Sequence, residues 1–161
     1  MSLRAVAVCV VLASLVGCDT AERSASVKHQ SGWQRQAGQS PQAAAQIAQQ
    51  MDKNTQDLHK AIQSGKAEDL MMMNGKLVSM GGQVAEQSDG SWTIKCDDGW
   101  TCVAQVNDLT PNSNASRDNI EKCGCAGIVQ QIDSTNKKII LADVNLAPTM
   151  KNPMAENVAT K

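Results

Sequence analysis

Four cysteines in the second half of the chain are the residues whose type and spacing could do chemistry. They form a C-x5-C pair, Cys96 and Cys102, and a C-x-C pair, Cys123 and Cys125. Thiols can close disulfides, bind a metal ion or exchange electrons with other thiols. Neither spacing is common among zinc knuckles, so two structural disulfides are the first interpretation. The alternatives that stay open are a four-thiolate metal site and a redox pair formed by Cys123 and Cys125.

Strand geometry narrows the pairing of these cysteines. A three-residue loop after Cys96 pairs Cys96 with Trp100, which leaves Cys96 and Cys102 diagonal to each other. Diagonal Cβ atoms lie roughly 7 Å apart, whereas a disulfide needs roughly 3.5–4.5 Å. A bond between Cys123 and Cys125 would close a small, strained ring. We therefore expect two bridges from the hairpin to the strand of Cys123 and Cys125, with the connectivity left open.

A further cysteine, Cys18, closes an apolar N-terminal run. Arg4 and the uncharged residues 5–16 have the layout of an export signal, and the run is too short to span a bilayer as a helix. Residues 15–18 read LVGC and resemble the bacterial lipobox. That resemblance implies cleavage before Cys18, diacylglycerol on its thiol and acylation of the new amino terminus, which together anchor a protein stably. Asp19 favours the inner membrane, with the outer membrane as the alternative.

The elements that must position the four cysteines begin after a polar segment. Residues 18–39 are rich in Ser, Ala, Gln and Gly and are expected to form a lipidated flexible tether. Residues 40–73 are expected to be helical, because a Ser-Pro pair opens the segment and Gly65 suits a left-handed helix end. An apolar stripe at helical spacing follows, interrupted by Asn54. If this stripe stays exposed, it becomes a partner site. The stripe contains Ala44, Ile47, Met51, Leu58, Ala61 and Ile62.

From Lys76 onward the apolar spacing changes to alternation, which predicts strands. A turn with Gly99 in the left-handed conformation joins the second strand to the third, and Trp92 and Trp100 are expected to face inward. The order of three meandering strands, an irregular or short helical connection and two more strands is that of an OB-fold barrel. The five strands are expected over residues 76–84, 92–96, 100–106, 123–132 and 138–146, with a short helix over 117–122.

Four short motifs along this barrel resemble the bacterial tRNA-anticodon-like OB-fold proteins. They are NGKLV at residues 74–78, GQV at 82–84, CAGIV at 125–129 and IILADV at 139–144. In that family a helix precedes the first strand, and many members are exported or lipidated. The resemblance covers residues 66–146. It implies a fold and no particular activity.

Composition limits the function further. The chain has 15 Lys and Arg against 16 Asp and Glu, so its net charge does not favour the capture of nucleic acid. Phe and Tyr are absent, and the strand tryptophans are expected to point inward, away from any stacked base. We therefore expect no nucleic-acid partner. The chain carries no phosphate loop, nucleophile elbow, paired-carboxylate motif or metal-protease helix, so we expect no enzymatic activity and no cofactor.

The methionines and histidines are interpreted as packing or surface residues. The run at residues 71–73 is assigned to core packing, because consecutive helical positions point in different directions and Met fills irregular cores. His29 and His59 have no Ser, Cys or carboxylate partner at motif spacing.

The sequence predicts a mainly β protein, in which a five-stranded OB-fold-like barrel follows an amphipathic α-helix. The segments are a lipoprotein signal peptide (1–17), the lipidated tether (18–39), the helical segment (40–73), the barrel (74–147) and a C-terminal tail (148–161). The functional hypothesis is a disulfide-stapled, non-enzymatic binding or adaptor module, anchored by lipid to a membrane of the cell envelope and facing the periplasm. Its partner would be an envelope protein or an unidentified small molecule. The alternative is a periplasmic thiol-redox or metal-handling lipoprotein that uses Cys123 and Cys125.

Overall fold

The computed structural model describes residues 32–88, 90–107 and 110–151. The predicted signal peptide, the lipidation site at Cys18, the tether as far as residue 31 and the last ten residues lie outside these ranges. Among the described residues, no helix is both long enough and apolar enough to cross a bilayer.

Three helices lead into the barrel: α3 (Gly32–Ala37), α4 (Pro41–Ser64) and α5 (Ala67–Met71). The hydroxyl of Ser40 accepts a hydrogen bond from the Ala43 amide over 3.1 Å and caps the first turn of α4. At the other end Gly65 adopts a left-handed conformation with φ 65°, and its amide donates to the Ala61 carbonyl. The predicted start and end of the long helix are confirmed.

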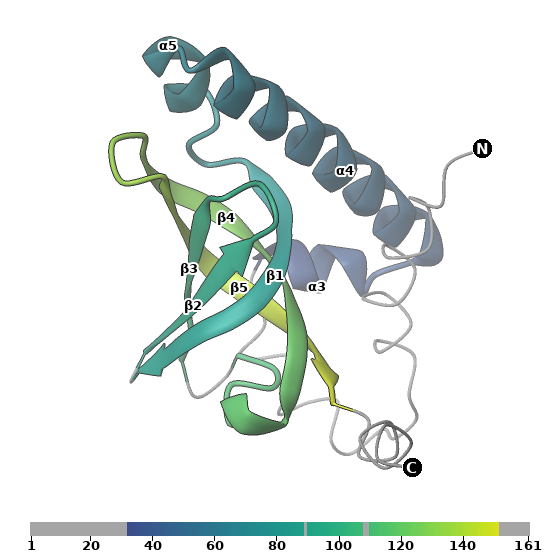
Figure 1. Ribbon diagram of the computed structural model, residues 1–161. Helices are drawn as coiled ribbons and strands as arrows, with labels where there is room; N and C mark the ends of the chain where they lie inside the picture. Colours follow the sequence, from purple (N-terminus) through teal and green to yellow (C-terminus); the bar gives the residue numbers. More distant parts are fainter. Residues whose placement is uncertain (1–31, 89, 108–109, 152–161) are drawn as a thin grey trace, which may run out of the picture.

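Five strands close into a barrel with the order β1-β2-β3-β5-β4. The pairing of β3 with β5 is parallel and all the other pairings are antiparallel, and β4 returns to β1 to close the barrel (Figure 1). This mainly β architecture confirms the predicted OB-fold-like barrel preceded by a helix. The strands are β1 (Leu77–Ser88), β2 (Ser91–Cys96), β3 (Thr101–Gln105), β4 (Ile120–Asp133) and β5 (Lys138–Met150).

The hairpin between β2 and β3 has the predicted register. Ile94 lies opposite Cys102, and the Cys96 amide donates to the Trp100 carbonyl over 2.8 Å. Gly99 closes the three-residue loop with φ 81°, in the left-handed region that a β-carbon disfavours. Because strand alternation then runs unbroken from this loop, the apolar residues of both strands face inward. Trp92 and Trp100 are buried there, as predicted.

The core of the barrel is aliphatic, sulfur-rich and continuous with the helices. Leu58 and Ala61 of α4 and Leu70 of α5 belong to the same buried cluster as the inward strand residues. The side chains that are almost completely buried are Trp92, Leu58, Ile94, Ile139, Leu141, Leu146, Val78, Val129, Cys102, Cys123 and Cys125.

Polar contacts hold α4 against the first half of β1. The Asn54 side-chain amide donates to the Leu77 carbonyl over 2.9 Å, and the Ser79 amide donates to the Thr55 hydroxyl over 2.9 Å. Asn54 interrupts the apolar stripe because it bonds to the strand backbone at the helix–barrel contact. The stripe residues Met51, Leu58 and Ala61 are buried with it, so the stripe is a packing surface and not an exposed partner site.

Several element boundaries differ from the sequence expectation. Residues 32–37, which we assigned to a flexible tether, form α3, where the Trp33 indole N–H donates to the Asp143 carbonyl over 3.1 Å. Figure 1 shows α3 beside the barrel and below the first half of α4. The expected helix at 117–122 is a 3-10 turn, η3 (Arg117–Asn119). β4 begins at Ile120, three residues before the expected start, and Ile120 is buried. β5 continues to Met150 because Met150 pairs with Ile120 in this added part of β4.

Candidate functional site

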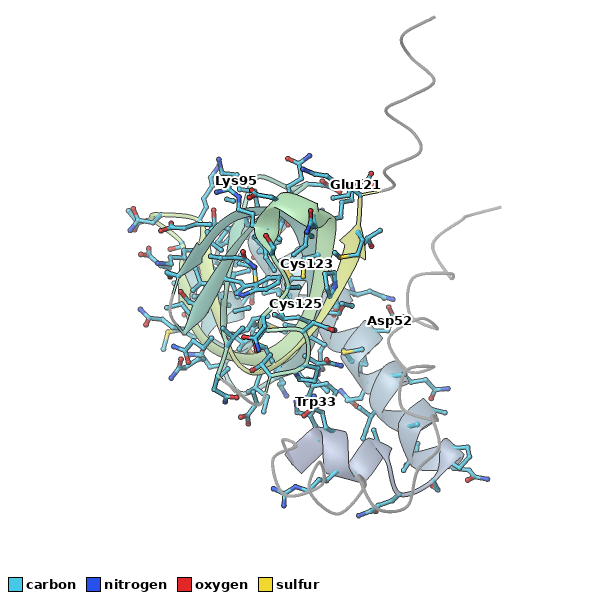
Figure 2. All side chains as sticks on the ribbon, turned by 90° about the horizontal axis from the view of Figure 1, so that it is seen from below. Trp33, Asp52, Lys95, Glu121, Cys123 and Cys125 are labelled. Carbon is cyan, nitrogen blue, oxygen red and sulfur yellow. The ribbon has the colours of Figure 1, made fainter. Side chains whose placement is uncertain are left out.

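The four cysteines of the described domain come together inside the barrel. Cys96 ends β2, Cys102 lies in β3, and Cys123 and Cys125 share one face of β4. Figure 2, which looks along the barrel from below, shows Cys123 and Cys125 inside the ring of strands. Cys102, Cys123 and Cys125 are buried and Cys96 is half-buried. The prediction that all four sulfurs lie inside or near one end of the barrel is therefore confirmed.

A glycine in β1 separates two of these cysteines. Gly82 pairs with Cys96 on one side and with Cys123 on the other. A β-carbon at Gly82 would overlap the carbonyl of Lys95, so the two strands approach more closely here than a side chain permits. Next to this row, Met80 pairs with Cys125. The register thus places Cys96 and Cys123 two strand spacings apart, with Gly82 between them.

One pair of sulfurs is close enough to interact directly. The Cys102 and Cys125 sulfurs lie 3.4 Å apart and share a hydrogen bond in which either can be the donor. Cys96 and Cys123 engage backbone instead: the Cys96 thiol donates to the Ile94 carbonyl and the Cys123 thiol to the Gly124 carbonyl.

All four of these cysteines are free thiols in the structure, whereas we expected two disulfide bridges from the sequence. Geometry explains why a second bridge is disfavoured. Two strand spacings of about 4.8 Å put the Cα atoms of Cys96 and Cys123 roughly 9 Å apart, beyond the limit of about 7 Å for a disulfide. The cluster therefore contains one pair of sulfurs within easy bonding reach.

The barrel interior holds the thiols of Cys96, Cys102 and Cys123 in their protonated form, because it raises the pKa of each. Burial, reinforced by the neighbouring Cys125 sulfur, raises the pKa of Cys96 from 9.0 to about 12. The same two causes raise the pKa of Cys123 to about 12. For Cys102, the hydrogen bond with Cys125 and then burial hold the pKa well above its usual value. A nucleophilic cysteine needs a lowered pKa, so this environment suits packing or bridging.

Metal binding by the same sulfurs finds no support in the described geometry. No group of three or more His, Cys, Asp or Glu side chains within residues 32–88, 90–107 and 110–151 is arranged to hold a metal ion. The arrangement of these thiols in the described part of the chain therefore does not support the metal-handling hypothesis.

A second candidate site is a depression on the outward face of β3 and β5, with a volume of about 600 Å³. Strand alternation turns Val103 and Ile140 outward, opposite each other in the parallel pair. Ser91, Gln105 and Asp143 also line the depression, so polar and apolar side chains share it. Small-molecule pockets are usually enclosed and mostly apolar, whereas this depression is open and mainly polar.

Two further polar contacts, one made by Gln87 and one by His59, could not be expected from the sequence. The Gln87 side chain donates to the Ala115 carbonyl over 2.7 Å and accepts from the Arg117 amide over 2.8 Å, which fastens the segment before β4 to β1. His59 Nδ1 lies 3.6 Å from Asp98 Oδ2 and connects α4 to the hairpin loop. Both contacts join residues far apart in the sequence, so no local spacing could have indicated them.

The methionine run only partly follows its prediction. Met73 is buried in the core, as predicted, whereas Met71 and Met72 are 70% and 73% exposed. The run crosses the end of α5, and the helix turns its first two methionines toward solvent.

Comparison with known proteins gives one structural similarity. No family model matches the sequence, and no curated protein matches it. Among solved structures, the chain is similar to U. maydis replication protein A bound to ssDNA, with 14% identity and a TM-score of 0.35. The match covers 58% of this chain and 81% of that chain.

This similarity corrects one expectation about partners. We expected no nucleic acid to bind, on the basis of charge and the inward strand tryptophans. The similar structure is bound to ssDNA, so the exclusion of nucleic acid is withdrawn. At this identity and TM-score the similarity assigns no ligand to this chain.

Proposed function

We propose that the chain is a lipid-anchored bacterial envelope protein whose barrel is a non-enzymatic binding or adaptor module facing the periplasm. The observation that carries the proposal is the LVGC sequence at residues 15–18, directly after an uncharged apolar run. Acylation of Cys18 would supply the two or more chains that stable anchoring requires. Asp19 favours the inner membrane within this proposal.

The properties of the barrel support a binding role. The apolar stripe of α4 is packed against the barrel, so the helix has no large apolar face left for a partner. The depression around Val103 and Ile140 offers an open, mainly polar surface with two outward apolar side chains on the outer side of the sheet, which suits contact with a protein surface better than an enclosed small molecule. The thiols of Cys96 and Cys123 are protonated at neutral pH, which favours a structural use of the cysteines. We assign the binding surface to this depression.

Metabolic labelling with palmitate tests the anchor. The full chain is expressed in a bacterium, and incorporation of labelled palmitate is compared with that in the C18S and C9S variants. Cys9 lies in the same apolar run and is the matched control. We expect label in the wild type and in C9S, and its complete loss in C18S. Equal labelling of C18S, or no labelling of the wild type, would overturn the proposal.

Site-specific crosslinking tests the binding surface. A photoreactive residue replaces Val103 in the depression or, as control, Lys53 on the exposed side of α4. We expect crosslinks to an envelope component from position 103 and none from position 53. Equal crosslinking at both positions would contradict the assignment. Titration of the same chain with a fluorescent single-stranded oligonucleotide provides a second arm. Tight binding that is blocked by V103E, which repels phosphate, would assign this face to nucleic acid and contradict the adaptor role.

A further inference from the structure

We propose that Cys102 and Cys125 form a single disulfide across the interior of the barrel, and that Cys96 and Cys123 remain thiols. The inference deepens the proposed function and rests on it for the oxidising compartment. It replaces the two bridges expected from the sequence with one bridge of defined partners.

The geometry of the pair carries the assignment. The two sulfurs lie 3.4 Å apart, and a disulfide would bring them to about 2.05 Å. Cys102 lies opposite Ile139 and Cys125 opposite Leu146, at different levels of β5, and both side chains are buried in the barrel interior. A bond between them would join β3 to β4, two strands that share no backbone ladder. No other pair of the four sulfurs shares a hydrogen bond among the described residues.

The other two thiols lack a comparable partner. Cys96 and Cys123 are separated by the Gly82 backbone, and each thiol is satisfied by a carbonyl oxygen of its own strand. Closing a bond between them would require two strands to move toward each other across β1. The close contact between Gly82 and Lys95 leaves little room for that movement.

Bond formation requires a disulfide-bearing oxidant of the periplasmic space. The thiolate of one cysteine attacks the oxidant's disulfide and forms a mixed disulfide, and the oxidant's second sulfur leaves as a thiolate. The thiolate of the other cysteine then attacks the mixed disulfide, which forms the Cys102–Cys125 bond and releases the oxidant as a dithiol. Two protons and two electrons leave the pair in total.

Burial places this reaction before the barrel closes. Cys102 is 0% and Cys125 2% exposed, so a bulky disulfide reagent cannot reach either sulfur in the folded chain. We infer that the pair is oxidised while the chain folds after export. A chain that folds in the reduced state would then be oxidised only as fast as it opens.

The test maps the cysteines of the full chain isolated from the cell envelope. The sample is quenched in acid and alkylated under denaturing conditions without reduction, and the peptides are identified by mass spectrometry. We expect a linked pair of peptides carrying Cys102 and Cys125, with alkylation at Cys96 and Cys123. In the C96A/C123A variant the linked pair should persist, and in C102A it should disappear. Any other linkage or a metal ion retained in the native mass would overturn the proposal, and the meaning of four alkylated sites is decided by the second arm.

A second arm separates this inference from the proposed function. The full chain with C9S and C18S is purified reduced from the cytoplasm, unfolded in urea and refolded in a glutathione redox buffer. The Cys102–Cys125 bond should form here regardless of export. Failure of this arm overturns the pairing, whereas a bond in this arm and four thiols in the envelope sample would overturn the oxidising location. If C102A fails to fold, the refolded C96A/C123A variant still tests the pairing.

Discussion

The side-chain amide of Asn54 donates a hydrogen bond to the Leu77 carbonyl over 2.9 Å and joins α4 to the first residue of β1. Asn54 is only 7% exposed and accepts a second bond from Gln50 over 2.9 Å. The contact therefore satisfies a half-buried strand carbonyl at the point where the chain changes from helix to barrel.

Replacing this asparagine should loosen the helix from the barrel. N54A leaves the Leu77 carbonyl without its donor, so we expect the free energy of unfolding to fall by about 1–3 kcal/mol. Q56A is the matched control, because Gln56 is an amide of the same helix that bonds only to Asp52 at the surface. Urea unfolding monitored by tryptophan fluorescence measures both variants. Equal stability of N54A and wild type would show that the helix contact contributes nothing.

The close approach at Gly82 should make that position intolerant of any side chain. A β-carbon there would overlap the Lys95 carbonyl, so G82A must push β1 away from β2. We expect a loss on the order of 3 kcal/mol, at the upper end of overpacking effects. The neighbouring G81A is the control, since its β-carbon would meet nothing closer than 3.8 Å. Thermal unfolding of the two variants distinguishes them, and equal melting temperatures would contradict the described register.

The raised thiol pKa values predict a stability that depends on alkaline pH. For Cys96 and Cys123 the pKa rises from 9.0 in the open chain to about 12 in the folded chain. Below pH 9 both states hold the proton, so stability is unaffected. Between pH 9 and 12 the unfolded chain releases protons that the folded chain keeps, and the free energy of unfolding must fall. Above about pH 12 both states are deprotonated and the fall levels off.

Urea unfolding of the reduced chain at pH 8 and pH 10.5 measures this effect. The C96A/C123A variant is the control, and it should lose less stability over the same interval because two of the three thiols with a raised pKa are removed, and only Cys102 remains. The absence of Tyr from the chain simplifies the comparison. An identical loss in the wild type and the variant would show that these thiols do not carry the dependence.

Trp33 should hold α3 against the barrel without contributing to the barrel itself. W33F keeps an aromatic ring but removes the indole N–H that donates to the Asp143 carbonyl. We expect faster amide hydrogen exchange over residues 32–37 and an unchanged midpoint of barrel unfolding. R35A, at an exposed position of the same short helix, should leave exchange unchanged. A loss of global stability in W33F would instead make α3 part of the folding core.

The strand register and the ends of α4 could be predicted where a few neighbouring residues determine the local conformation. The alternation around Cys96 and Cys102, together with Gly99, determines the loop length and therefore the inward face, and this register was confirmed. The caps of α4 at Ser40 and Gly65 were equally local. In each case the chemistry of a few neighbouring residues decides the conformation.

Features that depend on tertiary contacts could not be predicted from the sequence. Asn54 was visible as a break in the apolar stripe, but its partner is a strand carbonyl that only the docked helix reaches. The helix at Trp33 was assigned to the tether because its anchor, the Asp143 carbonyl, lies 110 positions along the chain. The expectation of two bridges could not allow for the strand of Gly82, which lies between Cys96 and Cys123 only once the barrel is closed.

The intact mass of the mature chain, extracted with detergent from the membranes of an expressing bacterium, tests the proposed lipid anchor most directly. The account predicts a chain that starts at Cys18 and carries the added mass of a diacylglycerol, with a further acyl chain on its amino terminus. A chain of unmodified mass, whether it is cleaved at another position or retains residues 1–17, would contradict it.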